Sequence, residues 1–141
     1  MSDKFGTMLE TGAVIGRDYS VLHWHEPRVR SSVFLPDSQD LWGVLWENRG
    51  QLVGFAHSHP GGGIPHPSYE DLTTFAAVEA ALGCRLRWWI VSDDAVVVVM
   101  HRGSTIRLDY EVNKIPEPTP DWVYDLRSKS GMLCNEEDNG S

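Results

Sequence analysis

Residues 51–83 read QLVGFAHSHPGGGIPHPSYEDLTTFAAVEAALG, and this stretch joins three elements of different character. The residues from Gln51 to His59 are rich in β-formers, which favours a strand. Gly and Pro then dominate a loop. Ser68, with an acid three residues later at Asp71, is typical of a helix N-cap, and Gly83 is typical of a helix C-cap. The stretch therefore predicts a strand–loop–helix unit.

Three side chains in this unit can converge on one point. His57 and His59 are two residues apart on a strand, so they point to the same face. Asp71 lies one turn inside the predicted helix, and the loop folds the start of that helix back toward the strand. Two imidazoles and one carboxylate leave the fourth position of a zinc ion for water, the arrangement of catalytic rather than structural zinc sites. We predict one zinc ion per chain, held by His57, His59 and Asp71.

The flanking sequence predicts an α/β (α+β) fold, a mostly antiparallel β-sheet flanked by two helices. Apolar residues at helical spacing from Ser38 to Glu47 indicate the other helix. The five-residue run from Val96 to Met100 favours a strand that is buried on both faces. The further strands, separated by turn residues, are expected at residues 12–16, 19–24, 32–35, 85–91, 95–101 and 105–112.

The character of the chain changes after Asn113. The proline-rich run from Ile115 to Pro120 is typical of an extended segment, and residues 134–141 are polar and acidic, which favours disorder. We therefore assign residues 1–113 to one domain and residues 114–141 to an extended, partly disordered C-terminal segment. Within that segment, Trp122, Tyr124 and Leu126 can dock on the domain or on a partner.

Composition narrows the classes of protein. The 141 residues carry a formal net charge of -8 and no cluster of basic residues, so no nucleic acid partner is expected. No apolar run reaches the roughly 20 residues of a membrane helix, and the first residues lack the pattern of a signal peptide, so we expect no membrane partner and a cytoplasmic protein. The oligomeric state stays open.

The tryptophans divide into two groups. We expect four of them to fill the core or a sheet face, and two to be candidates for a partner surface. The first group is Trp42, Trp46, Trp88 and Trp89, and the second is Trp24 and Trp122.

The sequence from His57 to Asp71 resembles the signature of the JAMM/MPN metalloprotease family, also called JAB domains, in its prokaryotic stand-alone form. The family pattern is an upstream glutamate, then His-(Ser/Thr)-His-Pro, a short loop and Ser-x-x-Asp. The resemblance implies that Ser68 helps to bind the developing oxyanion. It also implies that Glu10, which precedes Thr-Gly-Ala-Val-Ile-Gly16, is the general base. The loop between His59 and Ser68 holds eight residues, one more than is usual in the family.

The resemblance further implies a function. Family members are zinc peptidases that often cleave the isopeptide or C-terminal tail bond of a ubiquitin-like protein, and E1-like and E2-like conjugation enzymes are then expected as further partners. Two alternatives remain open. The first is a non-catalytic MPN scaffold that binds a partner, and the second is a relative of RadC-type proteins acting on DNA. The intact ligands disfavour the scaffold, and Ser58 and the acidic charge disfavour the RadC-type protein.

Overall fold

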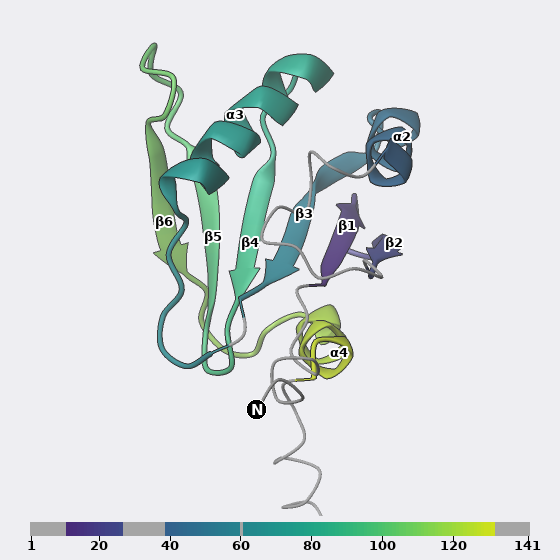
Figure 1. Ribbon diagram of the computed structural model, residues 1–141, viewed down its shortest axis with the longest axis vertical. Coiled ribbons are helices and arrows are strands. Elements are labelled where there is room, and N and C mark those ends of the chain that lie inside the picture. Colours follow the sequence, from purple (N-terminus) through teal and green to yellow (C-terminus); the bar gives the residue numbers. More distant parts are fainter. Residues whose placement is uncertain (1–10, 27–38, 60, 132–141) are drawn as a thin grey trace, which may run out of the picture.

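Six strands form one mixed sheet in the computed structural model, which describes residues 11–26, 39–59 and 61–131. The strand order is β2-β1-β3-β4-β5-β6, and every pair of neighbours is antiparallel except β3 and β4 (Figure 1). The predicted fold class, an α+β protein with a mostly antiparallel sheet, is confirmed. The strands are β1 (Gly12–Gly16), β2 (Val21–His25), β3 (Leu52–Ser58), β4 (Arg87–Val91), β5 (Val96–His101) and β6 (Tyr110–Lys114).

The one parallel pair, β3 and β4, is connected by the strand–loop–helix unit of residues 51–83. Parallel neighbours need a crossover connection, and here helix α3 (Tyr69–Leu82) provides it between β3 and β4. Gly54 permits the two strands to approach, because a Cβ at this position would collide with the carbonyl oxygen of Arg87. Helix α3 begins at the N-cap Ser68 and ends at Gly83, whose φ of 76° is left-handed, as predicted for both ends.

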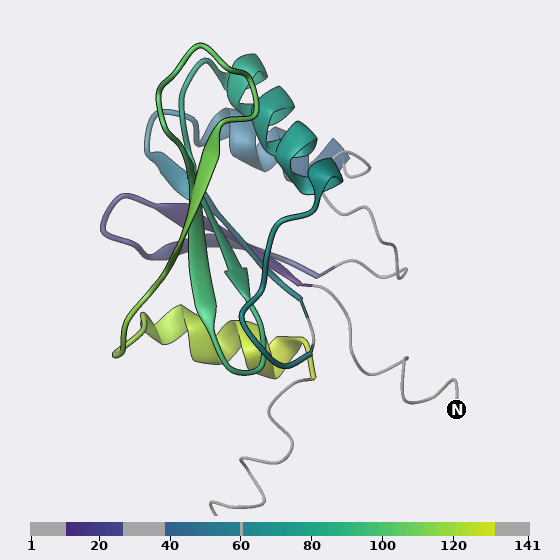
Figure 2. The same ribbon diagram turned by 90° about the vertical axis from the view of Figure 1, so that its left-hand side faces the viewer.

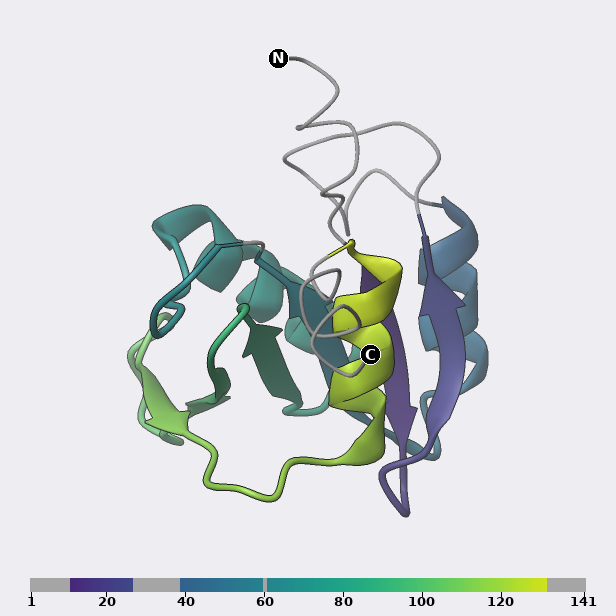
Figure 3. The ribbon, with the colours of Figure 1, turned by 90° about the horizontal axis from the view of Figure 1, so that it is seen from below.

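Helices cover both faces of the sheet (Figures 1 and 2). Helix α2 (Gln39–Glu47) contributes Leu41 and Leu45, and α3 contributes Phe75, to a core on one face. Helix α4 (Asp121–Lys129) lies against the other face, where it is seen end to end from below (Figure 3). The strand β5 contributes side chains to both cores, in line with the prediction from its valine run.

The prediction of an extended C-terminal segment is wrong for residues 121–129, which form α4. Trp122, Val123 and Leu126 fall on one face of that helix and are buried in the second core, so hydrophobic burial stabilises helix over extended chain. The described residues thus contain three helices rather than the predicted two. Residues 134–141 lie outside the described residues, and the division of the chain at residue 113 stays a prediction.

Two further expectations need correction. The strand predicted over residues 105–112 is found as Tyr110–Lys114, because Asp109 closes a longer turn by accepting hydrogen bonds from the Arg102 amide and the Ser104 hydroxyl. Trp42 and Trp46 are exposed. Since Leu41 and Leu45 take the buried stripe of α2, the next residue along is rotated by about 100° toward solvent.

The burial of the other tryptophans also differs from the prediction at one position. Trp88 and Trp89 are buried, as expected, but Trp122 is buried too and is therefore no partner surface. The strand predicted over residues 32–35 lies outside the described residues. Among the described helices, none is long and apolar enough to span a membrane.

Candidate metal centre

The end of β3 supplies two of the predicted ligands. His57 is 1% exposed and faces the core beneath α3, where its ring packs edge-on against Phe75. His59 follows the last strand residue, and its amide donates a hydrogen bond of 2.8 Å to the Val91 carbonyl, which prolongs the pairing with β4. This bond keeps His59 on the same side of the chain as His57, so the strand alternation fixes the direction of both rings.

The first turn of α3 supplies the third ligand. The Ser68 hydroxyl accepts a hydrogen bond of 3.0 Å from the Asp71 amide, and the Asp71 carboxylate accepts one of 2.9 Å from the Ser68 amide. This reciprocal capping box fixes where the helix begins. It also orients the Asp71 carboxylate, which is the predicted third ligand.

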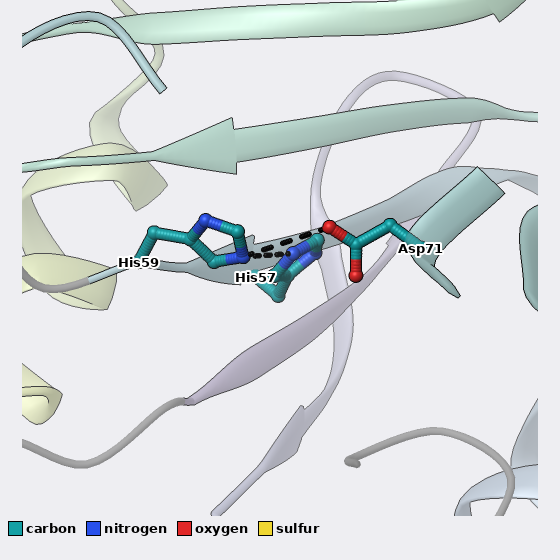
Figure 4. A group of neighbouring side chains, drawn as sticks. All are labelled: His57, His59 and Asp71. Carbon is teal, nitrogen blue, oxygen red and sulfur yellow. Dashed lines mark hydrogen bonds and ion pairs between the residues drawn. The ribbon is translucent and has the colours of Figure 1, made fainter. Parts of the chain in front are cut away.

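The three side chains converge (Figure 4). The Nε2 atoms of His57 and His59 are 3.0 Å apart, and His59 Nε2 lies 3.9 Å from Asp71 Oδ2. One ligand atom from each residue lies within 4.8 Å of the other two. Neighbouring ligand atoms of a tetrahedral zinc ion are about 3.3 Å apart, given bonds of about 2.0 Å. The arrangement therefore fits such an ion after side-chain shifts of less than about 1 Å.

The electrostatics of the two rings favour metal binding. Burial lowers the pKa of His57 well below its usual range, and the neighbouring His59 lowers it further. Burial also lowers the pKa of His59, while the Asp71 carboxylate opposes that shift. Both imidazoles are thus neutral at neutral pH, the protonation state in which a ring nitrogen can bind a metal.

The loop between the ligands is held from the β4–β5 turn. The Gly63 amide donates a hydrogen bond of 2.7 Å to the Asp94 carboxylate, and the Ser92 hydroxyl donates one of 2.5 Å to the Gly63 carbonyl. The amide of Asp93 donates to the carbonyl of Gly61. These bonds give a glycine-rich loop one conformation, and the sequence contained no signal for them because the partners lie about 30 residues away.

The other two predicted site residues are Glu10 and Ser68, and the structure describes only Ser68. Glu10 lies outside the described residues, so its place beside the ligands stays a prediction. Its chain neighbour Thr11 is described, and the Thr11 amide donates a hydrogen bond of 2.9 Å to the Ser58 hydroxyl, between the two histidines. Ser68 caps α3 beside the ligand Asp71, while its contact with an oxyanion stays a prediction.

A mixed sheet with a parallel β3–α3–β4 unit and a His-His-Asp cluster at its strand–helix junction define an α+β domain with a candidate metal site. A family model described as "Prokaryotic homologs of the JAB domain" matches residues 6–105, which is most of the chain. The chain belongs to this family, as its resemblance to the JAMM/MPN signature predicts. A search among curated proteins found no match.

Proposed function

We propose that this protein is a zinc-dependent isopeptidase or peptidase that cleaves the C-terminal tail linkage of a ubiquitin-like protein. The observation that carries the proposal is the convergence of His57, His59 and Asp71 within a JAB-family domain. Three protein ligands leave one position of a tetrahedral ion for water and substrate, as in catalytic zinc sites. When bound there, zinc would supply Lewis acidity and lower the pKa of a water.

The protein's own residues account for the other steps. In this proposal Glu10 removes the proton of the attacking water and delivers it to the leaving amine. The Ser68 hydroxyl already accepts the Asp71 amide, and its own O–H can donate to the developing oxyanion. The capping box that holds Ser68 also holds Asp71, so the oxyanion donor and the metal ligand move as one unit.

The substrate class rests on the family resemblance, since JAMM/MPN members often cleave the tail of a ubiquitin-like protein. A flexible Gly-Gly tail is narrow enough to lie in extended form beside a strand, in the manner of an added strand. E1-like and E2-like enzymes that attach the ubiquitin-like protein are the further partners that we propose.

The test is cleavage of ubiquitin-like fusions, joined through a linear peptide bond or through a lysine isopeptide bond. We expect the zinc-loaded protein to release the tail and a chelator to abolish release. Glu10→Gln should lower kcat by about 100-fold or more, the usual contribution of a general base. The matched control is Glu47→Gln, which changes an exposed acid in α2 and should leave cleavage unchanged.

Two results would count against the proposal. A protein that binds zinc tightly but leaves every fusion intact, while retaining the ubiquitin-like protein on a column, would favour the scaffold alternative. Unchanged cleavage by Glu10→Gln would remove Glu10 from the mechanism.

A further inference from the structure

The residue between the two histidine ligands faces the opposite side of the sheet. Ser58 is completely buried, and its hydroxyl accepts the hydrogen bond from the Thr11 amide. Its Oγ lies 2.8 Å from the Oγ of Ser130, which follows the last turn of α4 and is also completely buried. The C-terminal helix therefore contacts the short piece of chain that carries His57 and His59.

The two hydroxyls form one hydrogen-bonded cluster with backbone groups. Ser130 Oγ lies 2.8 Å from both Ser58 Oγ and the Leu126 carbonyl, to either of which its proton can donate. Ser58 Oγ accepts the Thr11 amide and lies 3.5 Å from the Thr11 carbonyl, to which its own proton can donate. Every group has a partner in this arrangement, and a buried cluster of this kind resists displacement because an unsatisfied member costs free energy.

A second set of contacts connects α4 to the loop that follows His59. The Arg127 side chain in α4 donates a hydrogen bond of 2.8 Å from Nε to the Ser92 carbonyl. The hydroxyl of the same Ser92 donates to the Gly63 carbonyl in the loop that leads to α3. Thus α4 is connected to the chain on both sides of His59, directly through Ser58 before it and indirectly, through Ser92 and Gly63, after it.

Helix α4 is held in place for these contacts by its packing on the sheet. Trp122, Val123 and Leu126 are buried against the sheet, and the Trp122 ring packs edge-on against Trp89 in β4. This helix lies beyond residues 6–105, the part of the chain that the family model matches.

We propose that α4 belongs to the metal centre functionally, with Ser130 and Arg127 as positioning residues that set the geometry of His57 and His59. Ser130 acts through Ser58, and Arg127 acts through Ser92 and the glycine loop. The inference rests on the proposed function only in taking His57, His59 and Asp71 as metal ligands.

The test measures metal binding rather than hydrolysis, with Co²⁺ alone as the probe. Co²⁺ suits the same ligands as zinc and reports their geometry through its visible absorption. We expect Ser130→Ala to weaken Co²⁺ binding by about five- to tenfold, less than the roughly 10- to 100-fold effect of groups that hydrogen-bond a ligand directly, because Ser130 acts through Ser58. The absorption bands should also change. Ser130→Thr, which keeps the hydroxyl, should restore most of the affinity.

The matched control is Ser128→Ala, the same substitution at an exposed position of α4, and it should bind Co²⁺ as the unaltered protein does. Arg127→Gln gives a second arm, because its half-buried side chain can be changed without opening the core, and about threefold weaker binding is expected. This arm decides the matter if Ser130→Ala does not fold.

The inference is overturned if Ser130→Ala or Arg127→Gln lowers the Tm of the metal-free protein but leaves Co²⁺ affinity and absorption unchanged, since that is the signature of a purely structural contact. It is also overturned if the unaltered protein binds no Co²⁺. A protein that binds Co²⁺ but cleaves no fusion contradicts the proposed function alone.

Discussion

Two of the three carboxylates of helix α3 lie in contrasting surroundings, Asp71 in its first turn and Glu79 near its end. Glu79 is 2% exposed and accepts four hydrogen bonds. The donors are Arg85 Nη1 at 3.0 Å, the Leu86 amide at 3.0 Å, Trp88 Nε1 at 2.8 Å and the Tyr110 hydroxyl at 2.6 Å. This carboxylate is saturated by the protein and fastens the end of α3 to β4 and β6.

The Asp71 carboxylate has far fewer hydrogen-bond donors around it than the Glu79 carboxylate. Its carboxylate accepts the capping bond from the Ser68 amide and lies 3.9 Å from His59 Nε2, with its side chain 15% exposed. An ionised carboxylate offers about four acceptor positions, so capacity remains for a cation. Burial of a charged group therefore does not by itself mark a functional site, as Glu79 shows. The stronger mark is a carboxylate such as Asp71, which lies beside other ligand atoms and still has acceptor positions open.

The largest effect should come from removing the open carboxylate. We expect Asp71→Ala to weaken Zn²⁺ and Co²⁺ binding by more than about 100-fold, because a ligand matters more than the residues that orient it. The free energy of unfolding of the metal-free protein should fall by no more than about 1 kcal/mol, the worth of one exposed hydrogen bond. Metal titration and urea unfolding measure the two quantities.

Glu70→Ala is the control for this change, since it removes an exposed acid from the same turn. If Asp71→Ala bound metal as well as this control, the open carboxylate would not be a ligand and the contrast with Glu79 would fail.

The saturated carboxylate should show the reverse pattern. Glu79→Ala leaves the buried Leu86 amide and Trp88 indole N–H, and the part-buried Tyr110 hydroxyl, without their acceptor, while Arg85 is exposed enough to turn to water. Since each unsatisfied buried group costs about 1 to 3 kcal/mol, we expect the free energy of unfolding to fall by about 3 to 5 kcal/mol. Glu79→Gln keeps one acceptor oxygen and should lose less. Urea unfolding checks the loss, and Co²⁺ binding at a temperature where the variant is folded should be unchanged. A large loss of metal affinity there would mean that the two ends of α3 are coupled.

The smallest effect concerns the pH dependence of the Glu79 cluster. Burial, followed by the hydrogen bond to Glu79, raises the pKa of Tyr110 above its usual value of about 10. A pKa that is raised in the folded state contributes stability that is complete below the unfolded-state pKa of about 10. This contribution is lost as the pH rises from about 10 through the higher folded-state pKa. We expect Tyr110→Phe to lower the free energy of unfolding by about 1 kcal/mol at neutral pH and to make it less sensitive to alkaline pH.

Unfolding curves measured at several pH values test this prediction. Tyr124→Phe is the control, because this exposed tyrosine in α4 has no part in the cluster. Identical alkaline behaviour of Tyr110→Phe and the unaltered protein would show that Tyr110 does not titrate with unfolding.

Much of the candidate site was predictable because its parts are local. The alternation of a strand directs His57 and His59 to one side, and the capping box places Asp71 within four residues of Ser68. The helix α4 was missed because its apolar residues lie between prolines and a polar tail. Only the sheet face that buries Trp122 and Leu126 makes the helical arrangement favourable. The exposure of Trp46 was missed because its hydrophobicity says nothing of which helix face is buried.

The sequence by itself determined the strand–loop–helix unit, the identity of the three candidate ligands and the family, since strand alternation and helix capping act over a few residues. Only the tertiary structure decided which acid is saturated and which is open, and which distant groups hold the ligands. Ser58 and Ser130 are 72 residues apart, and Glu79 and Tyr110 are 31 apart. Such contacts exist only after the sheet has formed and the helices have packed on it, because their geometry depends on burial rather than on local preference.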